Sequence, residues 1–66
     1  MKVKKIDLGD VKIYVEKKKK KKGNAYYYIV YAKDKYGFAQ TFGRFKNKRT
    51  ALERAKELER KFRRML

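Results

Sequence analysis

The chain has 66 residues and a formal net charge of +15, because 22 Lys and Arg residues stand against only 7 Asp and Glu residues. This length allows one small domain, residues 1–66, and a hydrophobic content of 42% is too high for a disordered polybasic tail. The absence of Cys and His excludes disulfides and removes the usual zinc ligands, so no metal or other cofactor is expected.

Two strands are predicted at the start of the chain. Residues 11–17 alternate apolar and polar side chains with a period of two, which is typical of a half-buried strand. Residues 2–8 are a weaker strand candidate, and Gly9 and Asp10 between the two segments favour a hairpin turn. The predicted number of strands therefore stays open between three and four.

Six consecutive lysines, residues 17–22, follow the second segment. Their like charges repel one another, and Gly23 and Asn24 supply turn chemistry, so residues 17–24 are predicted to be a solvated basic loop. A polyanion that releases its counterions among these ammonium groups would explain the run. The alternative is a loop that only increases solubility.

The central strand is predicted at residues 25–33, AYYYIVYAK, which are rich in tyrosine and β-branched side chains. Residues 34–37 predict a tight turn in which Gly37 takes the positive φ of a bulged hairpin. Residues 38–45 form the return strand. Strict alternation assigns its side chains to two faces, with Phe38, Gln40 and Phe42 on one and Ala39 and Thr41 on the other.

A helix is predicted over residues 48–65. Apolar side chains recur there at steps of four and three residues and form one stripe: Ala51, Ala55, Leu58, Phe62 and Met65. Asn47 is a suitable N-cap. Three or four antiparallel strands followed by one amphipathic helix predict an α+β fold, in which one apolar face of the sheet packs on the C-terminal helix.

The central strand has apolar side chains on both faces, although one helix can cover only one of them. By parity, Tyr26, Tyr28, Val30 and Ala32 share one face, and Tyr27, Ile29, Tyr31 and Lys33 share the other. An uncovered tyrosine face bordered by basic residues suits nucleic acid, either a duplex groove or unpaired bases stacked on the rings. The alternatives are a closed barrel with tyrosines in both layers and a homodimer interface.

Residues 43–51, GRFKNKRTA, resemble the sheet-to-helix junction of AP2-like and integrase arm-type DNA-binding domains. That family typically has a Gly, an aromatic residue, a capping Thr or Asn and an Ala in this order, after a hairpin similar to residues 32–37. The resemblance covers residues 26–58. It implies a three-stranded sheet packed on one helix, with the open sheet face in the DNA major groove.

The resemblance also assigns individual residues. It packs Tyr26, Tyr28, Val30, Ala32, Phe38, Phe42 and Phe45 beneath Ala51, Ala55, Leu58 and Phe62. It places Tyr27, Ile29, Tyr31, Lys33, Ala39 and Thr41 toward DNA, with Arg44 near the edge of that face. The family usually carries arginines on the outward face of the central strand, where this chain has tyrosine and isoleucine. Shape, phosphate and apolar contacts are therefore favoured over base readout by arginine.

A second resemblance is to the small archaeal chromatin proteins of the Sul7d type. It rests on size, lysine content, a β-rich body and a C-terminal amphipathic helix. It implies an SH3-like barrel whose triple-stranded sheet binds the minor groove and wedges apolar residues into it.

No enzyme is expected, because nucleophilic catalysis of the usual kind needs Ser or Cys with His and the chain has none of the three. The sequence predicts a nucleic-acid-binding protein, with duplex DNA favoured over RNA or a single strand; a module that dimerises through its tyrosine face is the alternative. The predicted binding residues are Lys18, Lys19, Lys20, Lys21, Lys22, Tyr27, Ile29, Tyr31, Lys33, Thr41, Arg44, Lys46, Lys48 and Arg49.

The predicted location is the cytoplasm, or the nucleoid for a DNA-binding protein. The N-terminal residues lack the apolar segment of a secretory signal. Membrane binding is not expected, because the core needs the apolar stripe of the helix. The shortage of heat-labile residue types and the abundance of charged ones are typical of thermophilic proteins.

Overall fold

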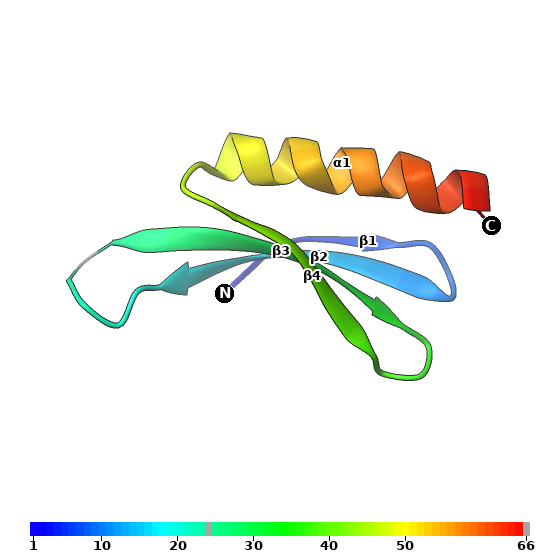
Figure 1. Ribbon diagram of the computed structural model, residues 1–66, viewed down its shortest axis with the longest axis horizontal. Coiled ribbons are helices and arrows are strands. Elements are labelled where there is room, and N and C mark those ends of the chain that lie inside the picture. Colours follow the sequence, from blue (N-terminus) through cyan, green and yellow to red (C-terminus); the bar gives the residue numbers. More distant parts are fainter. Residues whose placement is uncertain (24, 66) are drawn as a thin grey trace.

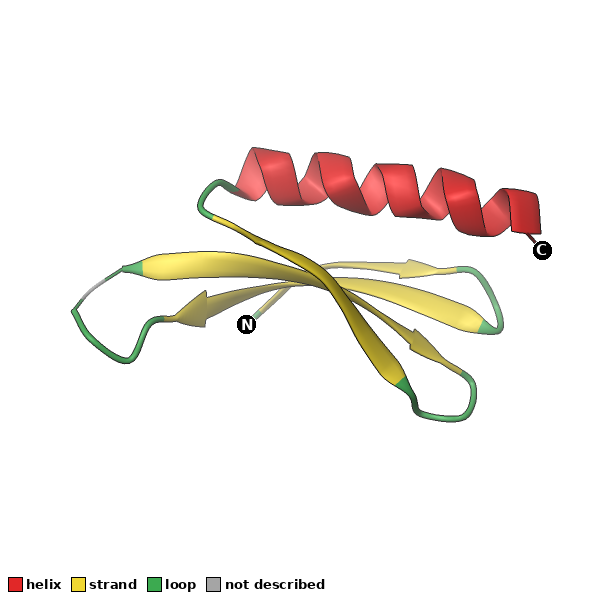
Figure 2. Ribbon diagram, viewed as in Figure 1, coloured by secondary structure: helices red, strands yellow, loops and turns green. Residues whose placement is uncertain are grey.

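The computed structural model describes residues 1–23 and 25–65, which form four strands and one helix. The elements are β1 (Lys2–Asp7), β2 (Val11–Lys19), β3 (Tyr26–Asp34), β4 (Ala39–Phe45) and α1 (Lys48–Met65). The strands are antiparallel and lie in the order β1-β2-β3-β4, and α1 crosses one face of this open sheet (Figures 1 and 2). The predicted α+β fold is confirmed, and β1 is its fourth strand.

A small apolar core lies between the sheet and α1. Its buried residues come from β2, β3 and α1: Ile13, Val15, Val30, Ala32, Ala51, Ala55 and Leu58. The two alanines of α1 carry no atoms beyond Cβ, so the helix can lie close to the strands. Phe62 is half-buried beside this core, whereas Met65 is 76% exposed. The prediction that Met65 belongs to the packed stripe is wrong, because that stripe ends one turn earlier, at Phe62.

Two aromatic residues that the resemblance assigns to the packed layer lie outside it. Tyr26 is 48% exposed and Phe38 is 77% exposed. Tyr26 begins β3 opposite Lys19, and Phe38 precedes β4, so both lie at the ends of strands, beyond the area that α1 covers. These two assignments are wrong. The remaining assigned residues of β3 and β4 lie in the core or pack against it: Tyr28, Val30, Ala32, Phe42 and Phe45.

A β-bulge interrupts β4. Pairing with β3 passes from Thr41 to Gly43 at consecutive positions, so Phe42 has no cross-strand partner there. Gly43 has a φ of +149°, and a Cβ atom at this position would lie 2.9 Å from Cζ of Phe45. Both the backbone angle and the contact with this ring therefore favour glycine.

The bulge changes which side chains share a face. Phe42 and Phe45 are three residues apart, yet both pack against the core beneath α1. Arg44 lies opposite Ile29 on the other side of the sheet. In an unbroken strand, Arg44 would share a face with Phe42. The bulge thus places the arginine of β4 on the uncovered side of the sheet.

The hairpin between β3 and β4 turns at residues 34–37. The N–H of Gly37 donates to the C=O of Asp34 at 3.1 Å, and Gly37 has a φ of +90°, which confirms the predicted turn conformation. Asp34 Oδ1 accepts the N–H groups of Tyr36 and Phe38 at 2.9 Å and 3.0 Å. The aspartate carboxylate thereby fixes the backbone of the turn.

The lysine run begins within β2, which continues through Lys19. The N–H of Lys17 donates to the C=O of Met1, the residue before β1, at 2.8 Å. The prediction of a loop that starts at residue 17 is therefore wrong. The repulsion acts between the ammonium groups and not on the backbone. In a strand, successive side chains project to opposite faces, which separates these groups, and the backbone forms hydrogen bonds with the neighbouring strands.

The connection between β2 and β3 is correspondingly shorter than predicted. The N–H of Lys20 donates to the C=O of Ala25 at 2.9 Å and closes this hairpin. Lys20, Lys21 and Lys22 are exposed within it. Asn24, the last residue of the predicted loop, lies outside the described residues.

Candidate nucleic-acid interface

The side of the sheet that points away from α1 carries residues that pair with one another across all four strands. We call it the open face and define it by these residues: Lys2, Lys5 and Asp7 of β1, Lys12, Tyr14, Glu16 and Lys18 of β2, Tyr27, Ile29, Tyr31 and Lys33 of β3, and Ala39, Thr41 and Arg44 of β4. Basic side chains outnumber acidic ones on every strand. The open face is therefore electropositive, with tyrosines at its centre.

One half of the open face is packed on itself. The rings of Tyr14 and Tyr31 are stacked, with centroids 5.1 Å apart and planes inclined by 17°. The Nζ atoms of Lys2 and Lys5 lie 5.1 Å and 6.0 Å from the centroid of the Tyr14 ring, and Tyr14 is only 9% exposed. The hydroxyl of Tyr31 donates to Glu16 Oε2. These contacts bury Tyr14 and occupy one face of the Tyr31 ring and its hydroxyl.

The environment of Tyr31 also determines its protonation. Burial raises the pKa of the Tyr31 hydroxyl to about 12, and the hydrogen bond to Glu16 and the negative charge of that carboxylate add to the increase. The hydroxyl therefore keeps its proton at pH 10, where an ordinary tyrosine is half ionised. Because the hydroxyl already donates its hydrogen bond to Glu16, Tyr31 is a poor donor to a phosphate.

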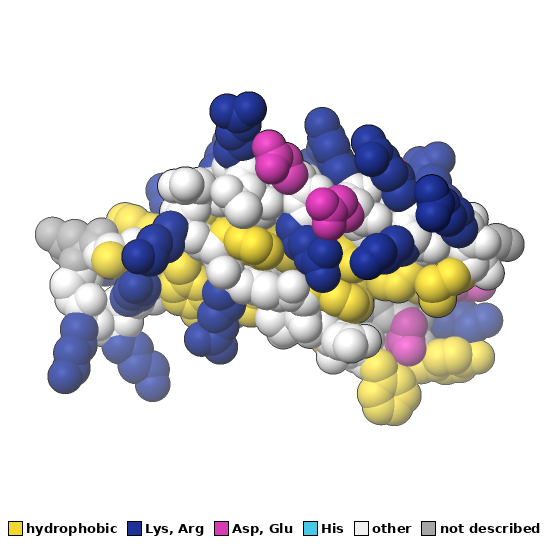
Figure 3. Space-filling view, turned by 45° about the horizontal axis from the view of Figure 1, so that its top comes forward, with side chains coloured by type: hydrophobic (Ala, Val, Ile, Leu, Met, Phe, Trp, Pro, Cys, Tyr) yellow, Lys and Arg dark blue, Asp and Glu magenta, His cyan; other side chains and the backbone are white. Residues whose placement is uncertain are grey.

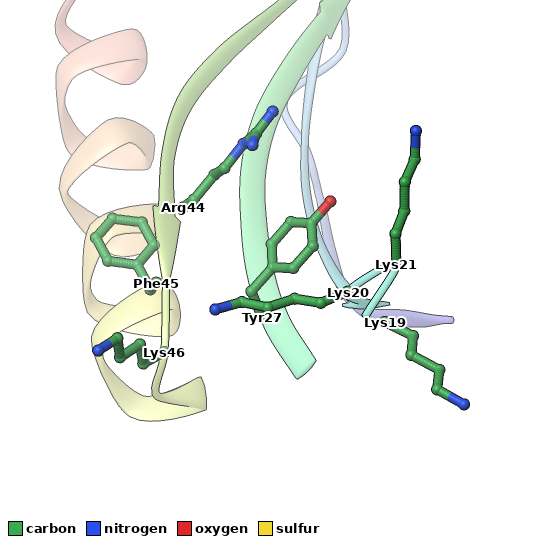
Figure 4. A pocket seen from close by; sticks show the side chains of 7 residues that line it. All are labelled: Lys19, Lys20, Lys21, Tyr27, Arg44, Phe45 and Lys46. Atoms are coloured by element: carbon green, nitrogen blue, oxygen red, sulfur yellow. The ribbon is translucent and has the colours of Figure 1, made fainter. Parts of the chain in front are cut away.

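A hollow lies at the edge of the open face, beside the β2–β3 connection. There Tyr27 and Arg44 of the open face meet Lys19 and Phe45 from the side that α1 covers. We call this the Tyr27 hollow; it has a volume of about 760 Å³ and is lined by Lys19, Lys20, Lys21, Tyr27, Arg44, Phe45 and Lys46. Cζ of Arg44 lies 5.6 Å from the centroid of the Tyr27 ring. Figure 4 shows Lys20 extending past Tyr27 toward β4, whereas Lys19 and Lys21 point away from the ring. The described lining combines cations with aromatic rings and contains no carboxylate.

Most of the predicted binding residues lie on the open face or at its edge. The Tyr27 hollow brings together Lys19, Lys20, Lys21, Tyr27, Arg44 and Lys46. Elsewhere on the open face are Lys18, Ile29, Tyr31, Lys33 and Thr41. Lys22 is exposed in the β2–β3 connection, outside the hollow.

Two predicted residues lie apart from this surface. Lys48 and Arg49 begin α1, where they line a shallow depression with Leu52, Glu53 and Lys56. Nε of Arg49 lies 3.4 Å from Oε1 of Glu53, four residues later on the helix. Because α1 covers the opposite side of the sheet, neither residue belongs to the open face.

The prediction missed six residues of the open face that belong to β1 and β2: Lys2, Lys5, Asp7, Lys12, Tyr14 and Glu16. The alternation within residues 11–17 contained the signal for the three residues of β2, since every second residue there is apolar and faces the core. The three residues of β1 depended on a strand that the sequence indicates only weakly.

The opposite end of the molecule has a different surface. Tyr36 and Phe38 at the tip of the β3–β4 hairpin are 75% and 77% exposed. Asp10 and Asp34 line a depression at the same end together with lysines. In Figure 3, dark-blue Lys and Arg side chains are spread over the visible surface, and hydrophobic side chains project at the end away from the β2–β3 connection. Among the residues that the structure describes, the lining of the Tyr27 hollow contains four lysines and Arg44 beside Tyr27 and Phe45 but no acidic residue, whereas this end has both aspartates and lysines.

No family model matches the chain, and neither does any curated protein or solved structure. Across residues 1–23 and 25–65, no three side chains of His, Cys, Asp or Glu gather where they could hold a metal ion. Within the same residues, the one helix, α1, is not long and apolar enough to cross a membrane.

Proposed function

We propose that this protein binds nucleic acid without catalysing a reaction and that duplex DNA is its main ligand. The observation that carries the proposal is the open face, where all four strands place basic side chains around tyrosines on the side of the sheet that α1 leaves uncovered. Such cations neutralise phosphates and release counterions, which favours binding to any duplex sequence. The resemblance to AP2-like and integrase arm-type domains implies the same use of this face.

The width of the sheet favours partial insertion into the major groove. Four strands spaced by about 4.8 Å span about 14 Å between the outer strand axes, whereas the major groove of B-DNA is about 12 Å wide. In the proposed complex, β3 and β4 enter the groove with Thr41 and Arg44. The lysines of β1 and β2 then lie over the flanking phosphates, with Lys5 and Lys18 as examples.

We expect little preference for base sequence. Arg44 can donate two hydrogen bonds to a guanine, and Thr41 can contact a base edge. Tyr31 donates its hydroxyl to Glu16, and Tyr14 is covered by lysines, so neither tyrosine is available for direct readout. Phosphate contacts and DNA shape therefore supply most of the binding free energy in this proposal.

Fluorescence anisotropy with a labelled blunt duplex tests the proposal. If about six phosphates are neutralised, raising the salt concentration from about 50 to 200 mM should lower the affinity on the order of 10³-fold. An affinity that is nearly independent of salt would contradict the phosphate-centred account. A salt-stable homodimer that binds no duplex, detected by sedimentation, would favour the interaction module instead.

A matched pair of double variants tests whether the open face is the binding surface. K18Q/R44Q removes a lysine and an arginine from the open face, and K48Q/R49Q removes the same two residue types from the start of α1. Net charge is equal in the two proteins, so long-range attraction changes equally. We expect a much larger loss of affinity for K18Q/R44Q. Equal losses would mean that net charge, and not the open face, determines binding.

A further inference from the structure

The Tyr27 hollow differs from the rest of the open face in what its aromatic ring contacts. Tyr31 stacks on Tyr14, with ring centroids 5.1 Å apart. Tyr27 instead lines the hollow, with the guanidinium of Arg44 5.6 Å from its centroid. We propose that this hollow binds one unpaired nucleotide of a nucleic-acid strand, with the base stacked against Tyr27 and Arg44. The inference rests on the proposed function and names the part of the ligand that this end of the open face selects.

The chemistry of the lining fits both parts of a nucleotide. An aromatic ring and a planar guanidinium are the two side-chain surfaces on which proteins stack unpaired bases. Lys20 extends past Tyr27 toward β4, and Lys46 follows the last residue of that strand. Both lysines line the hollow and could contact the phosphate of a nucleotide bound there. The volume of about 760 Å³ lies within the range of small-ligand pockets.

The ligand must be unpaired for a geometric reason. In a duplex, each base is stacked between its neighbours and its Watson–Crick edge is occupied, so extracting it costs free energy. The hollow lies at the end of β2 and β4, where the β2–β3 connection borders it. A nucleotide in a single-stranded overhang or gap beside a duplex on the open face can reach this position without being extracted. We therefore infer that the protein prefers a duplex that carries unpaired nucleotides.

The experiment compares two duplexes that differ only in their overhangs. One has a short single-stranded overhang with bases, and the other has an abasic overhang with the same sugars and phosphates. Charge is identical, so the ratio of the two dissociation constants reports the contribution of the bases, and the substitutions below assign it to stacking. Stacking on an aromatic side chain is expected to make the overhang with bases bind about tenfold tighter. A ratio of one, with the blunt duplex still bound, would overturn this inference; absence of binding to every duplex would overturn the proposed function itself.

Substitutions then locate the effect. Tyr27→Leu keeps an apolar side chain without a ring and should bring the ratio close to one, whereas Tyr27→Phe should preserve it. Tyr31→Leu, on the same strand and face, should preserve the ratio whatever its effect on overall affinity. A ratio that survives in Tyr27→Leu, or that disappears in Tyr31→Leu, would place the base elsewhere and overturn the assignment.

Arg44→Lys provides a second measurement that does not depend on the folding of the Tyr27 variants. It keeps the positive charge and removes the planar surface, so phosphate attraction stays while stacking on the guanidinium is lost. We expect the ratio to fall several-fold in this variant. An unchanged ratio in Arg44→Lys would contradict the proposed stacking on Arg44.

Discussion

Tyr31 donates its hydroxyl to Glu16 while its ring stacks on Tyr14, and this relationship divides the open face in two. On one side, tyrosine hydroxyl and ring both have partners within the protein, and lysine side chains cover what remains of Tyr14. On the other side, Tyr27 lines a hollow among cations. The first side thus acts as a small second packing layer, and the second side is the one that we propose for nucleotide binding.

The first prediction concerns stability at alkaline pH. Burial beside Glu16 raises the pKa of Tyr31 from 10.0 to about 12 on folding. Below pH 10 both the folded and the unfolded chain hold this proton, so the stabilisation is complete. Between pH 10 and about 12 only the folded chain retains it, so the free energy of unfolding should fall as the pH rises. Urea unfolding at several pH values measures this decline.

Tyr31→Phe isolates the contribution of this hydroxyl from those of other tyrosines and of the lysines. The variant should be about 1 kcal/mol less stable near neutral pH, because the hydrogen bond to Glu16 is lost. Its stability should also decline less steeply than that of the parent chain over the same alkaline range. Tyr36→Phe, which changes an exposed ring at the hairpin tip, is the control and should follow the parent. If the free energy of unfolding declines equally steeply with pH in Tyr31→Phe and in the parent chain, the role given to Glu16 is contradicted.

The second prediction concerns the bulge in β4. Gly43→Ala places a Cβ atom 2.9 Å from the ring of Phe45 at a φ of +149°. We expect a loss of about 3 kcal/mol in the free energy of unfolding, since both backbone strain and a displaced ring contribute. Gly9→Ala is the matched control, because Gly9 has a φ of +89° and a Cβ atom there would meet no described atom within 4 Å. It should lose only about 1 kcal/mol; equal losses would show that the contact with Phe45 is unimportant.

The sequence predicts the elements that depend on local interactions. The turn at residues 34–37 follows from Gly37 and from the carboxylate of Asp34, which acts on backbone groups two and four residues away. The helix follows from its apolar period and begins at Lys48 as expected. In both cases the interactions that determine the structure lie within a few residues of each other in the chain.

The remaining features depend on partners that are distant in sequence. The extension of β2 through Lys19 depends on pairing with β3, and the coverage of Tyr14 depends on the lysines of β1. A glycine in a strand suggests a bulge, but only the packing of Phe42 and Phe45 against the core fixes where the alternation breaks. The lining of the Tyr27 hollow comes from β2, β3 and β4, so it could be predicted only from the pairing register of these three strands.

The third prediction is that salt stabilises the fold. A net charge of +15 on 66 residues creates repulsion that added ions screen. Salt also weakens the ion pairs of α1, but each has at least one exposed partner; the side chains of Arg49 and Glu53, for example, are 91% and 64% accessible. Such pairs contribute little, so relief of repulsion should dominate. We expect the melting temperature, followed by circular dichroism, to rise by several degrees between low salt and about 0.5 M NaCl; a decrease would contradict this balance.

The last prediction separates the β2–β3 connection from the rest of the proposed binding surface. K20Q/K21Q/K22Q removes three exposed charges beside the Tyr27 hollow, and K56Q/R60Q/K61Q removes three exposed charges from α1, on the opposite side of the sheet. Each lost phosphate contact lowers the slope of log affinity against log salt concentration by about 0.9. The first variant should therefore lose about two to three units of slope and bind all duplex sequences more weakly by a similar factor. The second should keep the parent slope, because its residues lie on α1, away from the proposed binding surface. If both variants lose the same slope, the lysines of the connection act only through net charge; if the first changes the order of affinities among duplex sequences, the connection takes part in sequence selection.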